Sequence, residues 1–223
     1  LPYFNKPPLA FWIHGLALHV AGVSIGAARL PSVAAALGCV LLTVGMAREL
    51  YTRRAAMLSG CALALSIEFF RRVREISLDM WQLLFMLAAL LLVVVGVKRE
   101  RAWLVVAAGA PLGLALMTKP LMAMVFVPLV AVWLLWSGQS RRVPHLIVAA
   151  CIAALVALPW HLSMIIIHGR EFLSQYFGAE IAERAAGTLG PASGGDKPWW
   201  FYLQQISTRH WPWLACVAMA LVQ

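Results

Sequence analysis

Apolar residues run along this chain in six long stretches, with short polar segments between them. The stretches cover residues 30–47, 55–70, 81–97, 102–117, 121–136 and 143–160, and a seventh begins near Trp211. Because backbone polar groups inside a bilayer need partners within the chain, stretches this apolar are predicted to be membrane-spanning helices. Each is somewhat shorter than the roughly 20 residues of a full span, and flanking Arg, Lys and Trp residues can supply the difference at the interfaces.

The basic residues between these stretches predict an orientation. Segments 48–54, 98–101 and 137–142 hold eight of the eighteen Lys and Arg residues, and such an excess marks cytoplasmic loops. Segments 71–79, 118–120 and 161–210 are then expected on the outer side. The cluster of Arg71, Arg72 and Arg74 goes against this rule. We interpret it as part of a functional site rather than as a topology error, although Glu68 can pair with one of its members.

Two further segments are predicted to be helical. Residues 8–22 follow a proline pair that suits a helix start, and they either span the membrane or lie along its surface. Residues 170–187 have helical spacing, with Phe172, Tyr176 and Phe177 on an apolar side. A Gly-, Pro- and Ser-rich link follows, and then the aromatic sequence WWFY, which is typical of a membrane interface.

Composition agrees with a membrane protein and narrows the partners. The chain is 62% hydrophobic, against about 45–50% in a soluble domain. The net charge of +9 follows from basic cytoplasmic loops, so no nucleic-acid partner is expected. The four cysteines lie in apolar stretches without metal-binding spacing and are expected to be inert. The start without Met and the end inside an apolar stretch lead us to expect a fragment of a longer protein.

Charged residues at the ends of the apolar stretches are the candidates for chemistry, because charges at membrane depth are costly and usually functional. Asp79 stands where the third stretch begins, and it suits either a general base, an anchor for a substrate hydroxyl, or a solvated helix cap. Lys119 ends the fourth stretch, where a lysine can also simply snorkel to the interface. Together with Lys6 and Arg184 it places cations on three outer segments, which suits a phosphate or pyrophosphate.

Metal binding has weak support in the sequence. His161 and His168 are two helical turns apart and can share a face, but no nearby residue completes a ligand set. Structural roles are expected for both histidines.

The order of short motifs resembles that of a known family. The chain contains, in sequence, NKPPL, ARLPS, REISLDM, LMTKP, LPWH, EFLSQYFGAEIAER and PWWFYL. In this it resembles the bacterial membrane glycosyltransferases related to the aminoarabinose transferase of lipid A and to the protein O-mannosyltransferases, over nearly the whole chain. The resemblance implies an all-α, GT-C-like transmembrane bundle with a partly helical outer loop. It also implies that residues 8–22 lie flat, as a surface helix on the outer face.

The resemblance further implies roles for individual residues. Lys6 matches the family lysine that contacts the phosphate of a polyprenyl-phosphate-linked sugar donor, and Arg184 matches an arginine of the outer helix with the same role. Lys119 matches the lysine of a family motif that has Gly where Pro120 stands here. Asp79 matches the second carboxylate of the family, and is the catalytic candidate within this chain.

Two departures from the family concern a metal site. Asn5 stands where the aminoarabinose transferases have a glutamate, and residues 179–181 are Ala, Glu and Ile where those enzymes supply a histidine ligand. We therefore expect no metal and no other cofactor. Arg74 and Glu180 are candidates for supporting roles, and the main catalytic aspartate of the family would precede Leu1.

The expected organisation is one transmembrane domain. Residues 1–29 form an outer loop with the surface helix, 30–160 form six spans, 161–210 form an outer loop with an amphipathic helix, and 211–223 begin another span. The expected function is transfer of a sugar from a polyprenyl-phosphate donor to a lipid A, other lipid, glycan or protein acceptor, at the outer side of a bacterial inner membrane. The alternatives are a transporter or flippase of an anionic lipid-linked substrate, which an internal repeat would favour, and a scaffold without catalytic activity.

Overall fold

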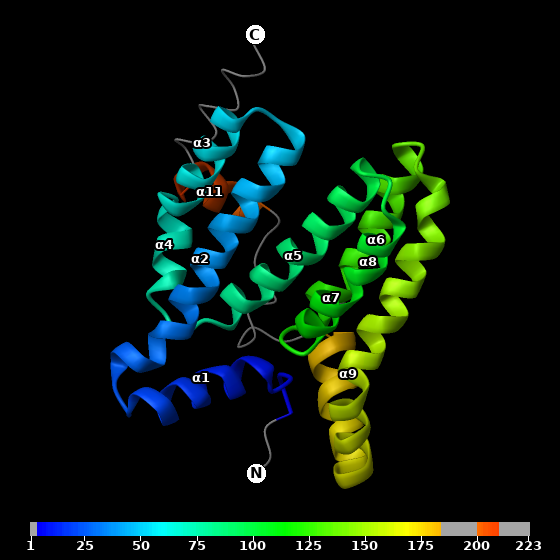
Figure 1. Ribbon diagram of the computed structural model, residues 1–223. Helices are drawn as coiled ribbons and strands as arrows, with labels where there is room; N and C mark the ends of the chain where they lie inside the picture. Colours follow the sequence, from blue (N-terminus) through cyan, green and yellow to red (C-terminus); the bar gives the residue numbers. More distant parts are fainter. Residues whose placement is uncertain (1–3, 184–199, 210–223) are drawn as a thin grey trace.

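Every element of the described chain is a helix. The computed structural model describes residues 4–183 and 200–209 (Figure 1). In chain order the elements are α1 (Leu9–Ala21), α2 (Ile25–Leu50), α3 (Arg53–Ala64), α4 (Ile67–Val73), α5 (Leu78–Lys98), α6 (Ala102–Ala107), α7 (Gly109–Leu116), α8 (Pro120–Trp136), the 3₁₀ turn η1 (Ser140–Arg142), α9 (Val143–Phe172), the π-helix η2 (Leu173–Glu183) and α11 (Trp200–Arg209). The predicted all-α class is confirmed.

Three of the described helices are long and apolar enough to cross a membrane. They are α2, α5 and the continuous segment Ser140–Gly178, which contains α9. Three shorter apolar helices accompany them, at Leu9–Ala21, Ala102–Leu116 and Pro120–Trp136. With 26 and 21 residues, α2 and α5 are longer than the apolar stretches inside them, so flanking residues do supply the missing length.

The helix boundaries differ from the apolar stretches in two ways. Stretch 55–70 is interrupted at Leu65 and Ser66, which separate α3 from α4, and stretch 102–117 is interrupted at Ala108. In contrast, α9 continues beyond Trp160 to Phe172, through a kink where Gly169 has a φ of 52°. The segment after Trp160 therefore begins as helix rather than as loop. Only glycine adopts this backbone conformation at little cost.

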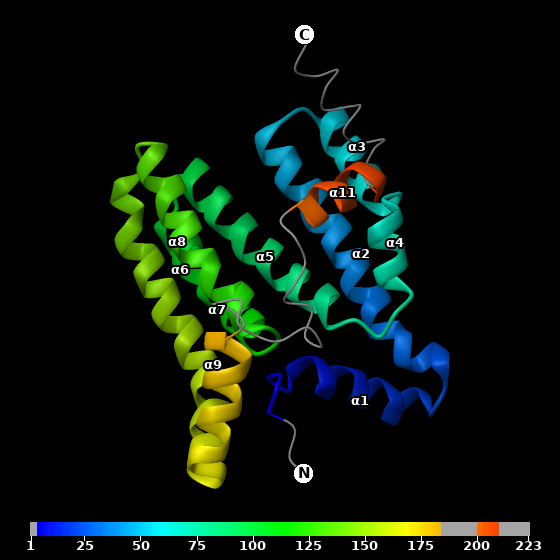
Figure 2. The same ribbon diagram turned by 180° about the vertical axis from the view of Figure 1, so that it is seen from behind.

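The bundle has two sides with α5 between them, and α1 crosses one end of it. Helices α2, α3 and α4 lie on one side of α5, and α6 to α9 lie on the other (Figures 1 and 2). The Leu9 N–H donates to the Met117 carbonyl oxygen at 3.2 Å. Near the middle of α1, the His14 Nδ1 lies 2.8 Å from the Ala28 carbonyl oxygen. These bonds hold α1 across the bundle, as expected of a surface helix and not of a span parallel to α2. We call this the α1 end.

The three segments predicted to be cytoplasmic meet at the opposite end. Arg99 pairs with Glu49, and Arg141 Nη2 lies 2.9 Å from Glu100 Oε1. These two pairs join segments 48–54, 98–101 and 137–142 to one another. The predicted grouping of the loops is confirmed, and the side of the membrane on which each end lies stays a prediction.

Close packing between α7 and α9 depends on two glycines one helical turn apart. A Cβ atom on Gly109 would lie 2.3 Å from the Ala149 carbonyl oxygen, and one on Gly113 would lie 2.5 Å from Val156 Cβ. Small residues at this spacing let two membrane helices approach closely. The main core is continuous with this contact and contains the buried residues Val93, Val105, Leu112, Leu134 and Leu146. This core holds α7 in place, and Lys119 comes three residues after the end of α7.

Candidate functional site

A pocket at the α1 end collects charged side chains from three segments of the chain. It has a volume of about 350 Å³ and is lined by Lys6, Arg72, Glu75, Asp79 and Lys119. Phe11, Ile76, Ser77 and Leu78 complete its wall. Three cations against two carboxylates leave the lining with a net charge of +1, which favours an anionic ligand. The structure thus brings together Lys6, Asp79 and Lys119, which the sequence singled out separately.

Asp79 and Lys119 form an ion pair in this pocket. Lys119 Nζ contacts Asp79 Oδ1, and Arg72 Nη1 lies 3.7 Å from Asp79 Oδ2. The two oxygens of the carboxylate therefore face two different cations. The Asp79 side chain is 40% exposed and that of Lys119 is 30% exposed. A pair open to water to this extent stabilises a fold by about 1 kcal/mol or less, so its main effect is on the position and charge of the pocket wall.

The backbone of Lys119 is held by a buried amide from the same helix that carries Asp79. Gln82 stands one turn after Asp79 on α5, and its Oε1 accepts a 3.2 Å hydrogen bond from the Lys119 N–H. The hydroxyl of Thr118 contacts the same Oε1 and lies 2.7 Å from the Ala115 carbonyl oxygen. Gln82 and Thr118 are buried. Helix α5 thus positions Lys119 twice, through its side chain and through its backbone. Sequence reasoning missed Gln82, since a single glutamine in an apolar stretch gives no signal of this kind.

The basic cluster at the end of α4 is largely neutralised by acidic neighbours. Arg71 Nη2 lies 2.7 Å from Glu68 Oε1, and this hydrogen bond, with the charge of Glu68, raises the pKa of Arg71. Arg72 Nε lies 3.7 Å from Glu68, and Arg72 Nη1 lies 3.3 Å from Glu75. The predicted pairing of Glu68 is confirmed. Arg72 is the member of the cluster that reaches Asp79, and the spacing of four, three and four residues along Glu68, Arg72, Glu75 and Asp79 was the available signal.

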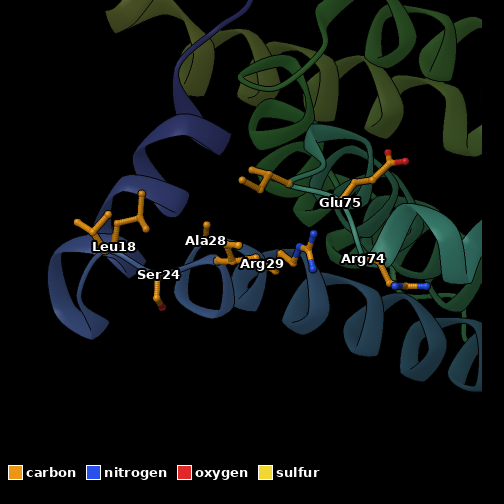
Figure 3. Close-up of a pocket in the computed structure, with 9 residues that line it drawn as sticks. Leu18, Ser24, Ala28, Arg29, Arg74 and Glu75 are labelled. Atoms are coloured by element: carbon orange, nitrogen blue, oxygen red, sulfur yellow. The ribbon is translucent and has the colours of Figure 1, made fainter.

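Arg74, which was expected to support the site, lies elsewhere. It lines a neighbouring pocket of about 720 Å³ together with Arg29 of α2 (Figure 3). The two pockets share only Glu75 and Ile76 in their walls. The structure therefore does not bring Arg74 together with Lys6, Asp79 and Lys119.

An aromatic cluster ties the segment before Lys6 to the end of α9 and to η2. Phe4 is buried, and its ring centroid lies 5.6 Å from that of Phe172. The rings of Phe172 and Tyr176 are stacked with centroids 4.9 Å apart, and both side chains are buried. The predicted apolar side of the outer helix is confirmed for these two residues, whereas Phe177 is 41% exposed. The cluster packs Phe4, two residues before Lys6, against the end of α9 and η2.

Several predicted features lie outside the described residues. Arg184 and the stretch that begins near Trp211 belong to the parts of the chain that are not described. Glu180 lies within η2, but its side chain is not described either. Their proposed roles stay predictions.

The two histidines weighed above as metal ligands, His161 and His168, have structural contacts. His161 Nε2 lies 2.9 Å from the Tyr176 hydroxyl, and its Nδ1 lies 2.8 Å from the Ala157 carbonyl oxygen. The ring of His168 meets that of Phe4 edge to face at 4.9 Å. Within residues 4–183 and 200–209, no three His, Cys, Asp or Glu side chains come together in a way that could hold a metal ion.

Comparison with known proteins places the chain among membrane glycosyltransferases. The model of the family described as dolichyl-phosphate-mannose-protein mannosyltransferase matches residues 5–162. The whole chain is 30% identical to the undecaprenyl phosphate-alpha-4-amino-4-deoxy-L-arabinose arabinosyl transferase of Pseudomonas paraeruginosa, of which it covers 41%. It is 27% identical, over 99% of its length, to the transferase of the same name from Erwinia tasmaniensis, of which it covers 40%.

The comparisons show how much of the relatives the chain spans and that the family match includes the pocket. The chain spans about two fifths of the length of these curated relatives, and the family match includes Lys6, Arg72, Asp79 and Lys119 of the pocket. No solved structure gives a significant match. From the family match and from its similarity to these relatives, the chain belongs to the dolichyl-phosphate-mannose-protein mannosyltransferase family.

Proposed function

We propose that this protein transfers a sugar from a polyprenyl-phosphate-linked donor to a lipid acceptor at the outer side of a bacterial inner membrane. The family supplies the reaction class, and the names of the relatives supply undecaprenyl phosphate as the carrier. The observation that carries the proposal to this chain is the pocket where Lys6, Arg72 and Lys119 meet Asp79. Cations at the end of a membrane bundle suit a phosphate whose hydrocarbon tail lies in the bilayer.

The reaction we propose is a direct displacement with inversion at the sugar. The hydroxyl oxygen of the acceptor forms a bond to the anomeric carbon, while the bond from that carbon to the phosphate oxygen breaks. The bonding electron pair leaves with polyprenyl phosphate, and the hydroxyl proton passes to a carboxylate. Negative charge grows on the leaving phosphate, and fixed cations around it are the stabilisation that usually matters most in such sites.

Separate residues of the chain have separate roles in this proposed reaction. Lys6 and Arg184 bind the leaving phosphate, and Lys119 adds a third cation from the turn before α8. Asp79 holds the Lys119 ammonium toward the pocket, and its carboxylate lines the space where an acceptor hydroxyl would approach. By the family resemblance, the main catalytic carboxylate would come from a segment that precedes Leu1.

The sugar and the acceptor follow less directly. The relatives carry 4-amino-4-deoxy-L-arabinose in their names, whereas Asn5 and Ile181 replace residues expected at the metal site of that group. We therefore propose transfer of a pentose or hexose. An assay with different sugars on the donor tests whether 4-amino-4-deoxy-L-arabinose is the one transferred. A transporter of the same anionic lipid is the second candidate. However, Asp79 in the first turn of α5 and Lys119 just before α8 place the pocket at the ends of these helices rather than near their middle.

The deciding experiment follows both halves of the donor. The full-length protein in proteoliposomes is given an undecaprenyl-phosphate sugar with a radiolabel in the sugar, together with extracted outer-membrane lipid. Transfer predicts labelled acceptor lipid and an equal amount of free undecaprenyl phosphate. Movement of intact donor across the bilayer without its cleavage would overturn the proposal in favour of a transporter.

A further inference from the structure

A second pocket opens at the α1 end beside the candidate site. It has a volume of about 720 Å³ and lies between the turn that joins α1 to α2 and the end of α4. Most of its lining is apolar, and its basic residues are Arg29 from α2 and Arg74 from the end of α4. In Figure 3 the Arg29 side chain extends from α2 toward the segment that carries Arg74 and Glu75. The remaining lining residues are Leu18, Val23, Ser24, Ile25, Ala28 and Ile76.

The two arginines differ from their neighbours in their lack of acidic partners. Among the described residues, no carboxylate forms an ion pair with Arg29 or Arg74, while Arg71 and Arg72 are both paired with Glu68. Arg74 instead lies over the ring of Phe70, at 6.0 Å from its centroid. Glu75 also lines the pocket, but it lies 3.3 Å from Arg72 and is engaged there. Arg29 and Arg74 therefore line the pocket without an ion-pair partner among the described residues, and with Glu75 they leave its lining with a net charge of +1.

The apolar part of the pocket lies where a bilayer would reach it. Val23 is 94% exposed and Ile25 is 71% exposed at the turn between α1 and α2. This turn lies at one end of α2, a helix long enough to span the membrane. Basic residues beside exposed apolar residues at the end of a span are the combination that binds anionic lipid headgroups. A free phosphate ion would use the arginines and leave the apolar wall uncovered.

We propose that the Arg29–Arg74 pocket binds the phosphate headgroup of an anionic membrane phospholipid, with the acyl chains along Val23 and Ile25. Each guanidinium can donate two parallel hydrogen bonds to phosphate oxygens. This site is separate from the pocket proposed for sugar transfer, because Lys6, Asp79 and Lys119 do not line it. A lipid bound here would brace the α1–α2 turn against the end of α4. The site exists whether or not the protein transfers a sugar.

Lipid retention tests this site without reference to enzyme activity. The full-length protein is purified in mixed micelles that contain equal amounts of phosphatidylglycerol and phosphatidylcholine, and the bound lipid is measured by native mass spectrometry. The wild type is expected to retain phosphatidylglycerol in preference to phosphatidylcholine. Since each basic residue near an anionic lipid strengthens binding about fivefold, the Arg29→Gln/Arg74→Gln variant should retain about thirtyfold less phosphatidylglycerol.

Matched variants separate the pocket from a general effect of charge. Arg71→Gln/Arg170→Gln removes two exposed arginines from the same end of the bundle but outside the pocket, and it should retain phosphatidylglycerol like the wild type. If the double pocket variant does not fold, the single changes Arg29→Gln and Arg74→Gln should each lower retention about fivefold.

Three results would overturn the proposal. The first is equal retention of the two lipids by the wild type, and the second is unchanged retention by the pocket variants. The third is displacement of the lipid by millimolar inorganic phosphate, which would show a site for free anions instead of lipid.

Discussion

The ammonium group of Lys119 contacts the carboxylate of Asp79 although 40 residues separate them in the chain. The contact joins the turn before α8 to the first turn of α5, and it places an ion pair in the wall of a pocket that also contains Lys6. Either residue alone has an ordinary explanation, as a helix cap or as an interfacial lysine. Together, beside two further cations, they form a site suited to an anion.

Removal of the Lys119 charge is expected to affect the reaction far more than the fold. Lys119→Met should lower kcat/KM for the lipid-linked donor about tenfold to hundredfold, because a charge-assisted hydrogen bond is worth roughly 1.5–3 kcal/mol. Its melting temperature should change little, since a pair with 30% and 40% exposed side chains contributes about 1 kcal/mol or less. Lys98→Met is the matched control, because Lys98 is exposed and lies at the end of α5 away from the pocket. A parallel loss of activity in both variants would argue against a specific role.

The phosphate clamp predicts a shared effect of two residues far apart in sequence. Lys6→Ala and Arg184→Ala should each lower kcat/KM about one to two decades when the donor is varied, by the same hydrogen-bond energy. The amount of protein in the membrane should stay unchanged. Lys6→Arg retains the charge and should recover much of the activity, and Arg170→Ala removes an exposed arginine near the same helix as a control. Full activity in both clamp variants would exclude the clamp and would favour the transporter.

Gln82 is expected to act by positioning Lys119. Gln82→Met removes one acceptor of the Lys119 N–H and of the Thr118 hydroxyl. Both donors also reach the Ala115 carbonyl oxygen, so the loss of stability should be about 0.5–1.5 kcal/mol, as for one hydrogen bond. Gln82→Met should also lower kcat/KM for the donor. In a Lys119→Met background, however, the same change should lower kcat/KM little further, because the two effects share one group.

The outcome of this double-mutant cycle separates positioning from simple stability. Losses that multiply in the double variant would show that Gln82 matters only for the fold. Thr43→Val is the control for loss of a helix hydroxyl, since the Thr43 hydroxyl donates to the Cys39 carbonyl oxygen of its own helix.

The apolar pattern predicted the helices well, because helices in lipid must satisfy their own backbone. It could not predict that α9 continues to Phe172, since His161, His168 and Arg170 make the sequence after Trp160 look polar. The structure accommodates these residues individually: His161 bonds to Tyr176, and His168 packs on Phe4. The polarity of a residue type therefore does not predict where a helix ends when the side chain has a partner in the fold.

The sequence predicted at which end of the bundle the site lies, but not which side chains contact one another there. Alternation of the spans places positions 6, 79 and 119 at the same end, and charge chemistry suggests an anion between them. Which arginine of the α4 cluster faces Asp79 depends on about 100° of helix rotation per residue, so Arg72 enters the pocket while Arg74 lines its neighbour. Pattern alone could not distinguish residues two positions apart at a helix end of uncertain register.

Close contact of α7 with α9 gives a prediction about stability. Gly113→Ala would place a Cβ atom 2.5 Å from Val156 Cβ and 2.9 Å from the Ala153 carbonyl oxygen. We expect a loss of about 1–3 kcal/mol in the free energy of unfolding, which is typical of overpacking. Gly45→Ala is the control, because the nearest atom to its Cβ is a Leu91 methyl group at 3.7 Å. Thermal unfolding in one detergent should show a lower melting temperature for the first variant only.

The orientation of the bundle gives the last prediction. Arg99 and Arg141 join the basic loops through Glu49 and Glu100 at the end opposite α1, and such loops remain in the cytoplasm. In a variant without native cysteines, Ser140→Cys should therefore be protected from an impermeant maleimide added to intact cells, and should react once the inner membrane is opened. Ser193→Cys, in the predicted outer segment, should react in cells whose outer membrane alone is permeable. Labelling of position 140 before the inner membrane is opened would reverse the orientation, and the pocket at the α1 end would then face the cytoplasm, where an outer-leaflet acceptor could not reach it.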